Sequence, residues 1–148
     1  MKIKPYERIV MPARVTPYLN FGGNAREAME FYQSIFGGTL DITTFADLRR
    51  AQDTSQENLV AHSLLKGVAG VMLMGSDTPT PEEYKPNGSF SVALGGDEEH
   101  LTEYWGKLSE AGTVTVPFTT SAWGALHGQC IDKFGTTWLV NVTATSSA

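Results

Sequence analysis

Two stretches of the chain repeat one pattern of apolar and polar positions. Each begins with a short strand-like run, passes through a Gly-Gly pair to an Asn or Asp, and continues as an amphipathic helical segment. The first stretch covers residues 16–32 and the second covers residues 89–105, with identical spacing. Gly37 and Gly38 follow the first helical segment and Gly112 follows the second, where glycine commonly ends a helix. The pattern predicts a strand and then a helix in each half.

The first helix is expected to begin after Asn24, which matches Asp97 in the second half. Asn24 and Glu27 have the spacing of a capping box, in which two side chains satisfy the free amides of the first turn. The apolar positions then recur at helical spacing. They are Ala28, Phe31, Tyr32, Ile35 and Phe36 in the first helix, and Leu101, Tyr104, Trp105 and Leu108 in the second.

Three strand-like runs follow each helical segment, at residues 39–45, 59–65 and 70–75 in the first half and 113–118, 126–131 and 136–142 in the second. Residues 62–70 have the spacing of residues 127–135. Internal repetition of this length predicts two βαβββ modules. Since one such module is too small to bury its own sheet, we expect the two to pack together.

The repeat also predicts the limits of the domain. We expect an N-terminal extension at residues 1–14, one domain at 15–142 and a polar tail at 143–148. Within the domain, modules 15–77 and 88–142 are joined by linker 78–87, which is rich in Pro, Glu and Thr.

Alternation along the strands separates two sheet faces. One face carries large apolar side chains and is expected to pack on the helices, as Leu19, Phe21, Val92, Trp138 and Val140 illustrate. The other face mixes Thr, Tyr, Asn, Ser, Leu and Met side chains. In a curled domain a mixed face of this kind indicates a cleft, and the alternative is a face that simply meets water.

Composition narrows the class of protein. The chain has 148 residues, of which 41% are hydrophobic, and its net charge is -5 without a basic run, which argues against nucleic acid as a partner. The apolar runs are far shorter than a membrane-spanning helix requires, and the N-terminal stretch lacks the apolar core of a signal peptide. A single cysteine, Cys130, precludes an intrachain disulfide. We therefore expect a cytoplasmic protein with no membrane partner.

Three segments together resemble a known family. They are YLNFGGNAREAMEFY at residues 18–32, HSLLKGVAGVMLMGSD at 62–77 and DKFGTTWLVN at 132–141. The combination resembles the PhnB-like branch of the vicinal oxygen chelate (glyoxalase/bleomycin resistance/dioxygenase) superfamily, over nearly all of residues 15–142. The resemblance implies an α+β fold in which two tandem βαβββ modules form a curled mixed sheet with a central cleft. It also implies a homodimer.

Some members of the branch carry a demethylubiquinone methyltransferase label. A methyl-donor cofactor is commonly bound by a glycine-rich loop between a strand and a helix, and neither Gly-Gly pair of this chain has the spacing of a phosphate-binding loop. We therefore expect no cofactor.

Metal-dependent members of the superfamily place ligands on the first and last strands of each half. Carried over by position, those places fall at Thr16, Met74, Ser89 and Leu139. None is a histidine or a carboxylate, the groups that a catalytic divalent ion requires. The sequence therefore predicts that the metal site usual in this superfamily is absent.

Two histidines, His62 and His127, occupy equivalent places in the two halves. They are candidates for binding an anionic group, for acid–base work or for an unusual metal site, and the alternative is a pair of structural histidines. Trp123, in a loop of small residues, is a candidate for stacking on a flat ligand, or for packing in a dimer. The predicted cleft residues are Tyr18, Asn20, His62, Met74, Ser89, Ser91, Trp123, His127, Leu139 and Asn141.

Other polar or reactive residues are weaker candidates. Cys130 falls in a predicted strand without a nearby basic partner, which indicates a buried, inert thiol. Asp77 ends a strand and is expected to cap a turn, and His100 is expected on the surface of the second helix.

These observations favour a metal-independent small-molecule-binding protein whose catalytic residues, if any, are unassigned. Two alternatives stay open. One is a metal-dependent lyase or dioxygenase of the same superfamily whose ligands lie elsewhere in the sequence. The other is a drug-sequestering resistance protein, which a net charge of -5 favours only weakly.

Overall fold

The computed structural model describes residues 13–86, 89–96, 98–120, 122 and 124–143. The first module contains β1 (Tyr18–Phe21), α1 (Ala25–Phe36), β2 (Thr39–Thr44), β3 (Val60–Lys66) and β4 (Met72–Asp77). The second contains β5 (Val92–Gly96), α2 (Glu98–Ser109), β6 (Thr113–Thr120), β7 (Leu126–Ile131) and β8 (Thr137–Val142). Short 3-10 helices cover Thr54–Gln56, Val68–Gly70 and Pro81–Glu83.

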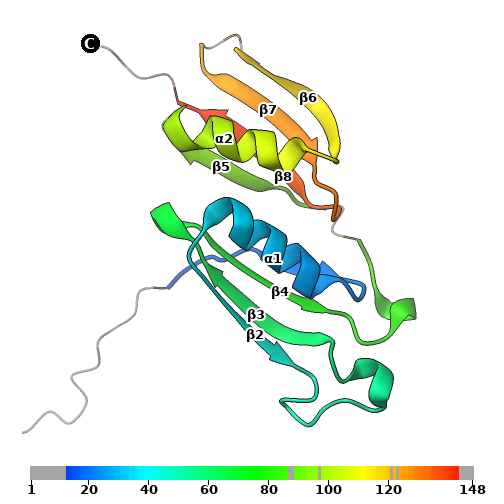
Figure 1. The fold of residues 1–148 in the computed structure, drawn as a ribbon. Coiled ribbons are helices and arrows are strands. Elements are labelled where there is room, and N and C mark those ends of the chain that lie inside the picture. The colour runs from blue at the N-terminus through cyan, green and yellow to red at the C-terminus, as the bar shows by residue number, and fades with distance from the viewer. Residues whose placement is uncertain (1–12, 87–88, 97, 121, 123, 144–148) are drawn as a thin grey trace, which may run out of the picture.

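The strands form two four-stranded mixed sheets, in the orders β1-β4-β3-β2 and β5-β8-β7-β6. The first strand of each module runs parallel to the last, and the remaining neighbours are antiparallel. Each helix covers one face of its own sheet, and both helices lie on the same side of the molecule (Figure 1). The α+β class and the two βαβββ modules predicted from the sequence are therefore confirmed.

The register of the first strands differs by two residues from the sequence repeat. Leu19 of β1 lies opposite Gly75 of β4. The repeat equivalent of Gly75 is Val140 of β8, but Val140 lies opposite Leu94 of β5, two residues beyond the repeat equivalent of Leu19. In the second module, β5 continues through Gly96, whereas the sequence repeat predicts a turn at the Gly-Gly pair. Because side chains alternate with a period of two, this shift leaves the predicted faces unchanged.

The first helix begins where the sequence predicts, but a different residue caps it. The side chain of Asn24 makes no capping hydrogen bond, so the predicted capping box is wrong. Instead Asp77 Oδ1 accepts hydrogen bonds from the backbone amides of Gly23 and Ala25, each at 2.9 Å. Its Oδ2 accepts from the Val60 amide at 2.9 Å. One buried carboxylate at the end of β4 thus fixes the start of α1 against β3.

The two modules share one hydrophobic core, as the size of each module requires. Phe36 at the end of α1 packs on two rings of the second module. Its ring centroid is 4.9 Å from that of Tyr104 in α2 and 5.7 Å from that of Trp138 in β8. Both helices therefore contribute to the packing between modules.

A buried carboxylate, Asp132, joins the modules through hydrogen bonds. Its Oδ2 accepts from the Tyr32 hydroxyl at 2.6 Å and from Trp138 Nε1 at 2.8 Å. Its Oδ1 accepts from the backbone amides of Phe134 at 2.8 Å and Thr136 at 3.1 Å. Burial, with the nearby Asp132 charge, raises the pKa of Tyr32 well above its ordinary value. The hydroxyl therefore stays protonated and remains a donor across the module boundary.

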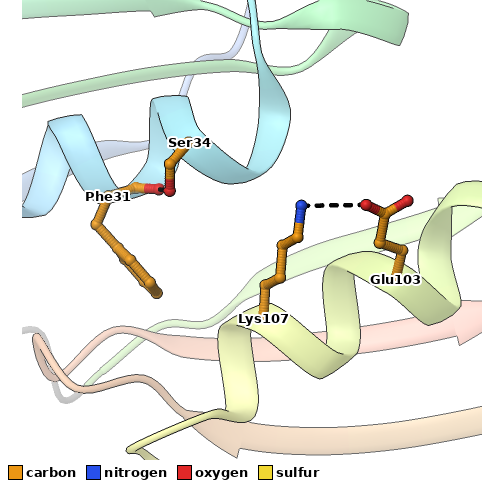
Figure 2. Close-up of polar contacts among 4 residues, drawn as sticks. All are labelled: Phe31, Ser34, Glu103 and Lys107. Atoms are coloured by element: carbon orange, nitrogen blue, oxygen red, sulfur yellow. Dashed lines mark hydrogen bonds and ion pairs between the residues drawn. The ribbon is translucent and has the colours of Figure 1, made fainter.

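Contacts on the exposed helix surfaces contribute less. Ser34 Oγ donates to the Phe31 carbonyl at 2.6 Å in α1, and Lys107 Nζ lies 3.1 Å from Glu103 Oε1 in α2 (Figure 2). The side chains of that ion pair are 45% and 59% exposed, so solvent screens most of their attraction. The buried Asp132 contact is the stronger candidate for holding the modules together.

We expect Asp132→Asn to lower the free energy of unfolding by about 3 kcal/mol, because an amide NH₂ would then face groups that are themselves donors. The matched control is Asp41→Asn on the exposed side of β2, which should change stability by less than about 0.5 kcal/mol. Urea denaturation of both variants measures the difference. Equal stabilities for the two variants would show that the Asp132 contact is not needed.

Candidate functional site

We use the term open face for the sides of the two sheets that are turned away from α1 and α2. Seven of the ten predicted cleft residues lie on strands and alternate with buried neighbours, which places them on the open face. Tyr18, Asn20, His62 and Met74 lie on the first sheet, and His127, Leu139 and Asn141 lie on the second. Because both helices cover the same side of the molecule, both parts of the open face lie on the other side (Figure 1).

On the first sheet, Tyr18, His62 and Met74 gather on neighbouring strands. The ring centroids of Tyr18 and His62 are 6.1 Å apart, at an interplanar angle of 31°. Tyr18 lies opposite Met74 in the parallel pair of β1 and β4. The Tyr18 side chain is 39% exposed, so an apolar and partly aromatic surface is accessible here.

On the second sheet, His127 and Asn141 lie opposite each other on β7 and β8, and Leu139 lies opposite Gln129. Nε2 of Gln129 lies 3.3 Å from Nε2 of His127 and donates to it in the tautomer that leaves this ring nitrogen without a proton. Asn141 Oδ1 is buried and has no hydrogen-bond partner among the described residues. An unpaired buried acceptor is costly and calls for an explanation.

The remaining predicted residues are placed differently. Ser89 and Ser91 are exposed and precede β5, and Trp123 lies outside the described residues. The structure brings the other predicted residues together as two groups, one on each sheet. That the two groups form one ligand site stays a prediction.

The residues at the usual metal positions do not suit a catalytic divalent ion. Met74 and Leu139 lie on the open face, Ser89 precedes β5, and Thr16 lies just before β1. A thioether, an aliphatic side chain and two hydroxyls lack the nitrogen and carboxylate donors that such an ion prefers. Over the described ranges, moreover, no three His, Cys, Asp or Glu side chains are grouped so that they could hold a metal. We derive no metal-assisted step from this site.

Sequence reasoning missed a cavity of about 1100 Å³ between the modules. It lies between β5 and α2 on one side and the β3–β4 turn with the segment before β1 on the other. Within the second module the turn equivalent to the β3–β4 turn carries Asp132 and Phe134, whereas the first module has Gly67 and Ala69. Those small residues are the sequence signal for the cavity.

Comparison with known proteins identifies the family. Residues 13–141 match the model of the family described as 3-demethylubiquinone-9 3-methyltransferase. The chain belongs to this family. Protein YjdN of Escherichia coli (strain K12) is 26% identical over 140 residues, which is 86% of this chain and 94% of that protein. Within the described residues, no helix is long and apolar enough to cross a membrane.

Solved structures agree with this family assignment. Protein PA1353 from Pseudomonas aeruginosa is 31% identical with a TM-score of 0.77, covering 88% of this chain and 98% of that one. A putative 3-demethylubiquinone-9 3-methyltransferase, PhnB protein, from Bacillus cereus is 22% identical with a TM-score of 0.71, covering 88% and 100%.

A glyoxalase/bleomycin resistance protein/dioxygenase family enzyme from Burkholderia phytofirmans shares the fold. Its TM-score is 0.57 at 12% identity, over 86% of this chain and 97% of that one. The predicted PhnB-like family and glyoxalase fold are therefore confirmed.

Cys130 lies in β7 with its side chain fully buried. Burial, with a further contribution from the Asp132 charge, raises the pKa of its thiol to about 11. We expect iodoacetamide at pH 8 to label native protein far more slowly than protein unfolded in urea, because the thiolate is scarce and shielded. Mass spectrometry measures both rates. Rapid labelling of the folded protein would show that this cysteine is accessible and reactive.

Proposed function

We propose that this protein binds a small organic molecule on the open face and does so without a metal ion. The observation that carries the proposal is the unpaired Asn141 Oδ1, which lies on a strand position opposite His127. Leaving such an acceptor unpaired in the ligand-free protein costs about 1–3 kcal/mol. A binding role accounts for a polar residue at a position where an apolar one would be more stable.

The surrounding side chains support binding of a molecule with both polar and flat apolar parts. A ligand with a hydroxyl, amine or amide group next to the Gln129–His127 pair would offer Asn141 Oδ1 a donor. Tyr18 and His62 present rings from the first sheet, on which an apolar part can pack. The residues that the sequence predicts to hold the ligand are Tyr18, His62, Ser91, Trp123 and His127, and of these Trp123 lies outside the described residues.

The donor chemistry favours this binding function over a metal-dependent lyase or dioxygenase. The four usual ligand positions hold Thr16, Met74, Ser89 and Leu139, and the polar side chains of the predicted cleft carry amides, hydroxyls and imidazoles. Such groups orient a neutral or weakly charged organic molecule by hydrogen bonds. The homodimer and the cytoplasmic location expected from the sequence remain predictions.

We expect Asn141→Leu to raise the free energy of unfolding by about 1 kcal/mol, because it removes an unpaired buried acceptor. The same variant should lose binding of the compounds that stabilise the natural sequence in a thermal-shift screen of small organic molecules run with EDTA. Thr137→Val is the matched control on the same strand and face, and it should keep that binding. Loss of stability in Asn141→Leu without any change in ligand binding would argue against the proposal.

Metal content gives an independent check on the same proposal. Protein purified without a metal-affinity tag should hold much less than one equivalent of any transition metal per chain, as measured by inductively coupled plasma mass spectrometry. One tightly held ion per chain that is lost on replacing His62 or His127 would contradict a metal-independent site and favour the lyase or dioxygenase alternative.

A further inference from the structure

The two modules meet at two contacts that are related by the internal repeat. Side chains fill one of these contacts, and the other contains a cavity. In each contact, the turn before the last strand of one module faces the helix of the other module. The β7–β8 turn faces α1, and the β3–β4 turn faces α2 across the cavity of about 1100 Å³. The filled contact therefore shows what the open one lacks.

In the filled contact the turn supplies a ring and a carboxylate. The Phe134 ring centroid is 5.4 Å from that of Phe31, and Lys133 Nζ lies 4.4 Å from the Phe31 centroid. Asp132 accepts the hydrogen bond of the Tyr32 hydroxyl. An aromatic group and an acid, both from residues 132–134, occupy the space between the modules.

In the open contact the equivalent residues are too small to do this. Gly67 stands in place of Asp132, and Ala69 stands in place of Phe134. Trp105, the equivalent of Tyr32, instead stacks on Phe118 of its own module with ring centroids 5.1 Å apart. Tyr104, the equivalent of Phe31, is left lining the cavity without a ring from the turn.

Packing prevents the turn from moving inward to fill this space. A Cβ added at Gly67 would lie 3.0 Å from Phe36 Cβ, which shows how closely the turn approaches α1. The Gly67 amide also donates to the Val71 carbonyl at 2.8 Å, which closes the turn on itself. Since the turn is held against its own module, the cavity persists instead of collapsing.

The chemistry of the walls indicates what fits. The inner walls are apolar and aromatic, and they include Leu73, Leu94, Leu101, Tyr104 and Trp138. A volume of about 1100 Å³ is slightly above the range typical of ligand pockets, about 300–1,000 Å³, so a drug-sized molecule fits. Contact between apolar walls and water is unfavourable, so an apolar ring system that enters the cavity and displaces water lowers the free energy.

The rim of the cavity carries ionisable groups of both signs. Arg14 and Lys66 lie on the side of the first module, and Arg14 Nη1 is 3.3 Å from Met72 Sδ. Glu99 and His100 lie on α2. Among the described lining residues, both cations belong to the first module and the carboxylate to the second, which favours an acidic group placed toward the first module.

We propose that this cavity is a second binding site for an aromatic molecule that carries an acidic group. Its rim borders the open face at Lys66 and Met72, whereas its apolar inner part lies on the helix side of the sheets. The ring system takes the place that Phe134 has in the related contact and packs beside Tyr104. The acidic group stays at the rim beside Arg14 and Lys66, which are cations of the cavity lining. This inference does not rest on the function proposed for the open face.

Anilinonaphthalene sulfonate, a fluorescent aromatic anion, is the probe for this site. We expect it to bind native protein saturably, with one molecule per chain. Val71→Asp places a carboxylate on the cavity wall and should weaken probe binding about tenfold. Val68→Asp is the matched control, because Val68 belongs to the same turn but is 54% exposed and lies outside the cavity lining. It should change the affinity less than about twofold.

Two further variants separate loss of the site from loss of the fold. Val71→Lys should strengthen probe binding, since the sign of the added charge is reversed at the same place. Leu94→Trp narrows the cavity from the opposite wall and should weaken binding while thermal unfolding stays cooperative. Equal effects of Val71→Asp and Val68→Asp, or weaker binding by Val71→Lys, would overturn the proposal.

Protein methyl spectra distinguish this site from the open face. On adding the probe, the methyl signals of Leu94 and Leu101 should shift, and those of Leu64 and Leu139 should not. Binding should also survive in Asn141→Leu. Shifts confined to Leu64 and Leu139 would assign the probe to the open face. Sedimentation that shows the probe competing with self-association would assign the cavity to a second copy of the chain, and either result would overturn the inference.

Discussion

A single buried carboxylate sets how the two halves of this molecule meet. Asp132 accepts four hydrogen bonds, and one of them comes from Tyr32 in the other module. A charge removed from water is stable in a protein only when donors surround it, so this arrangement tolerates little displacement. Together with the packing of Phe36 on Tyr104 and Trp138, that contact holds the two sheets in their relative position, which shapes the open face and the cavity.

The repeat makes the modules similar in fold, and the differences between them produce the functional features. The turn with Asp132 and Phe134 fills one contact between modules, whereas Gly67 and Ala69 leave the related contact open. On the other side of the sheets, Asn141 is a polar residue without a partner on a strand whose inward residues are apolar. Both proposed binding sites thus include positions at which the two halves of the sequence differ.

Patterns local in sequence predicted the fold well, because alternation and helical spacing depend on near neighbours. They did not predict the residue that caps α1, because Asp77 lies 52 residues from Ala25 in the sequence. The Gly-Gly pair suggested a turn before α2, yet β5 continues through Gly96 because its pairing with β8 extends to Val142. The Tyr32–Asp132 contact joins residues that are 100 positions apart, so no periodicity in the sequence predicts it. The cavity beside α2 also depends on contacts between the modules, and the sequence patterns did not predict it either.

The central claim is that the open face recognises its ligand without a metal ion. Met74 and Leu139 stand at two of the positions where metal-dependent relatives place ligands. Paramagnetic broadening by Mn²⁺ tests this directly, because an ion bound there would broaden nearby methyl signals. We predict that equimolar Mn²⁺ leaves the methyl signals of Met74 and Leu139 as sharp as they are in the presence of EDTA. Selective loss of both signals, restored by EDTA, would contradict the account.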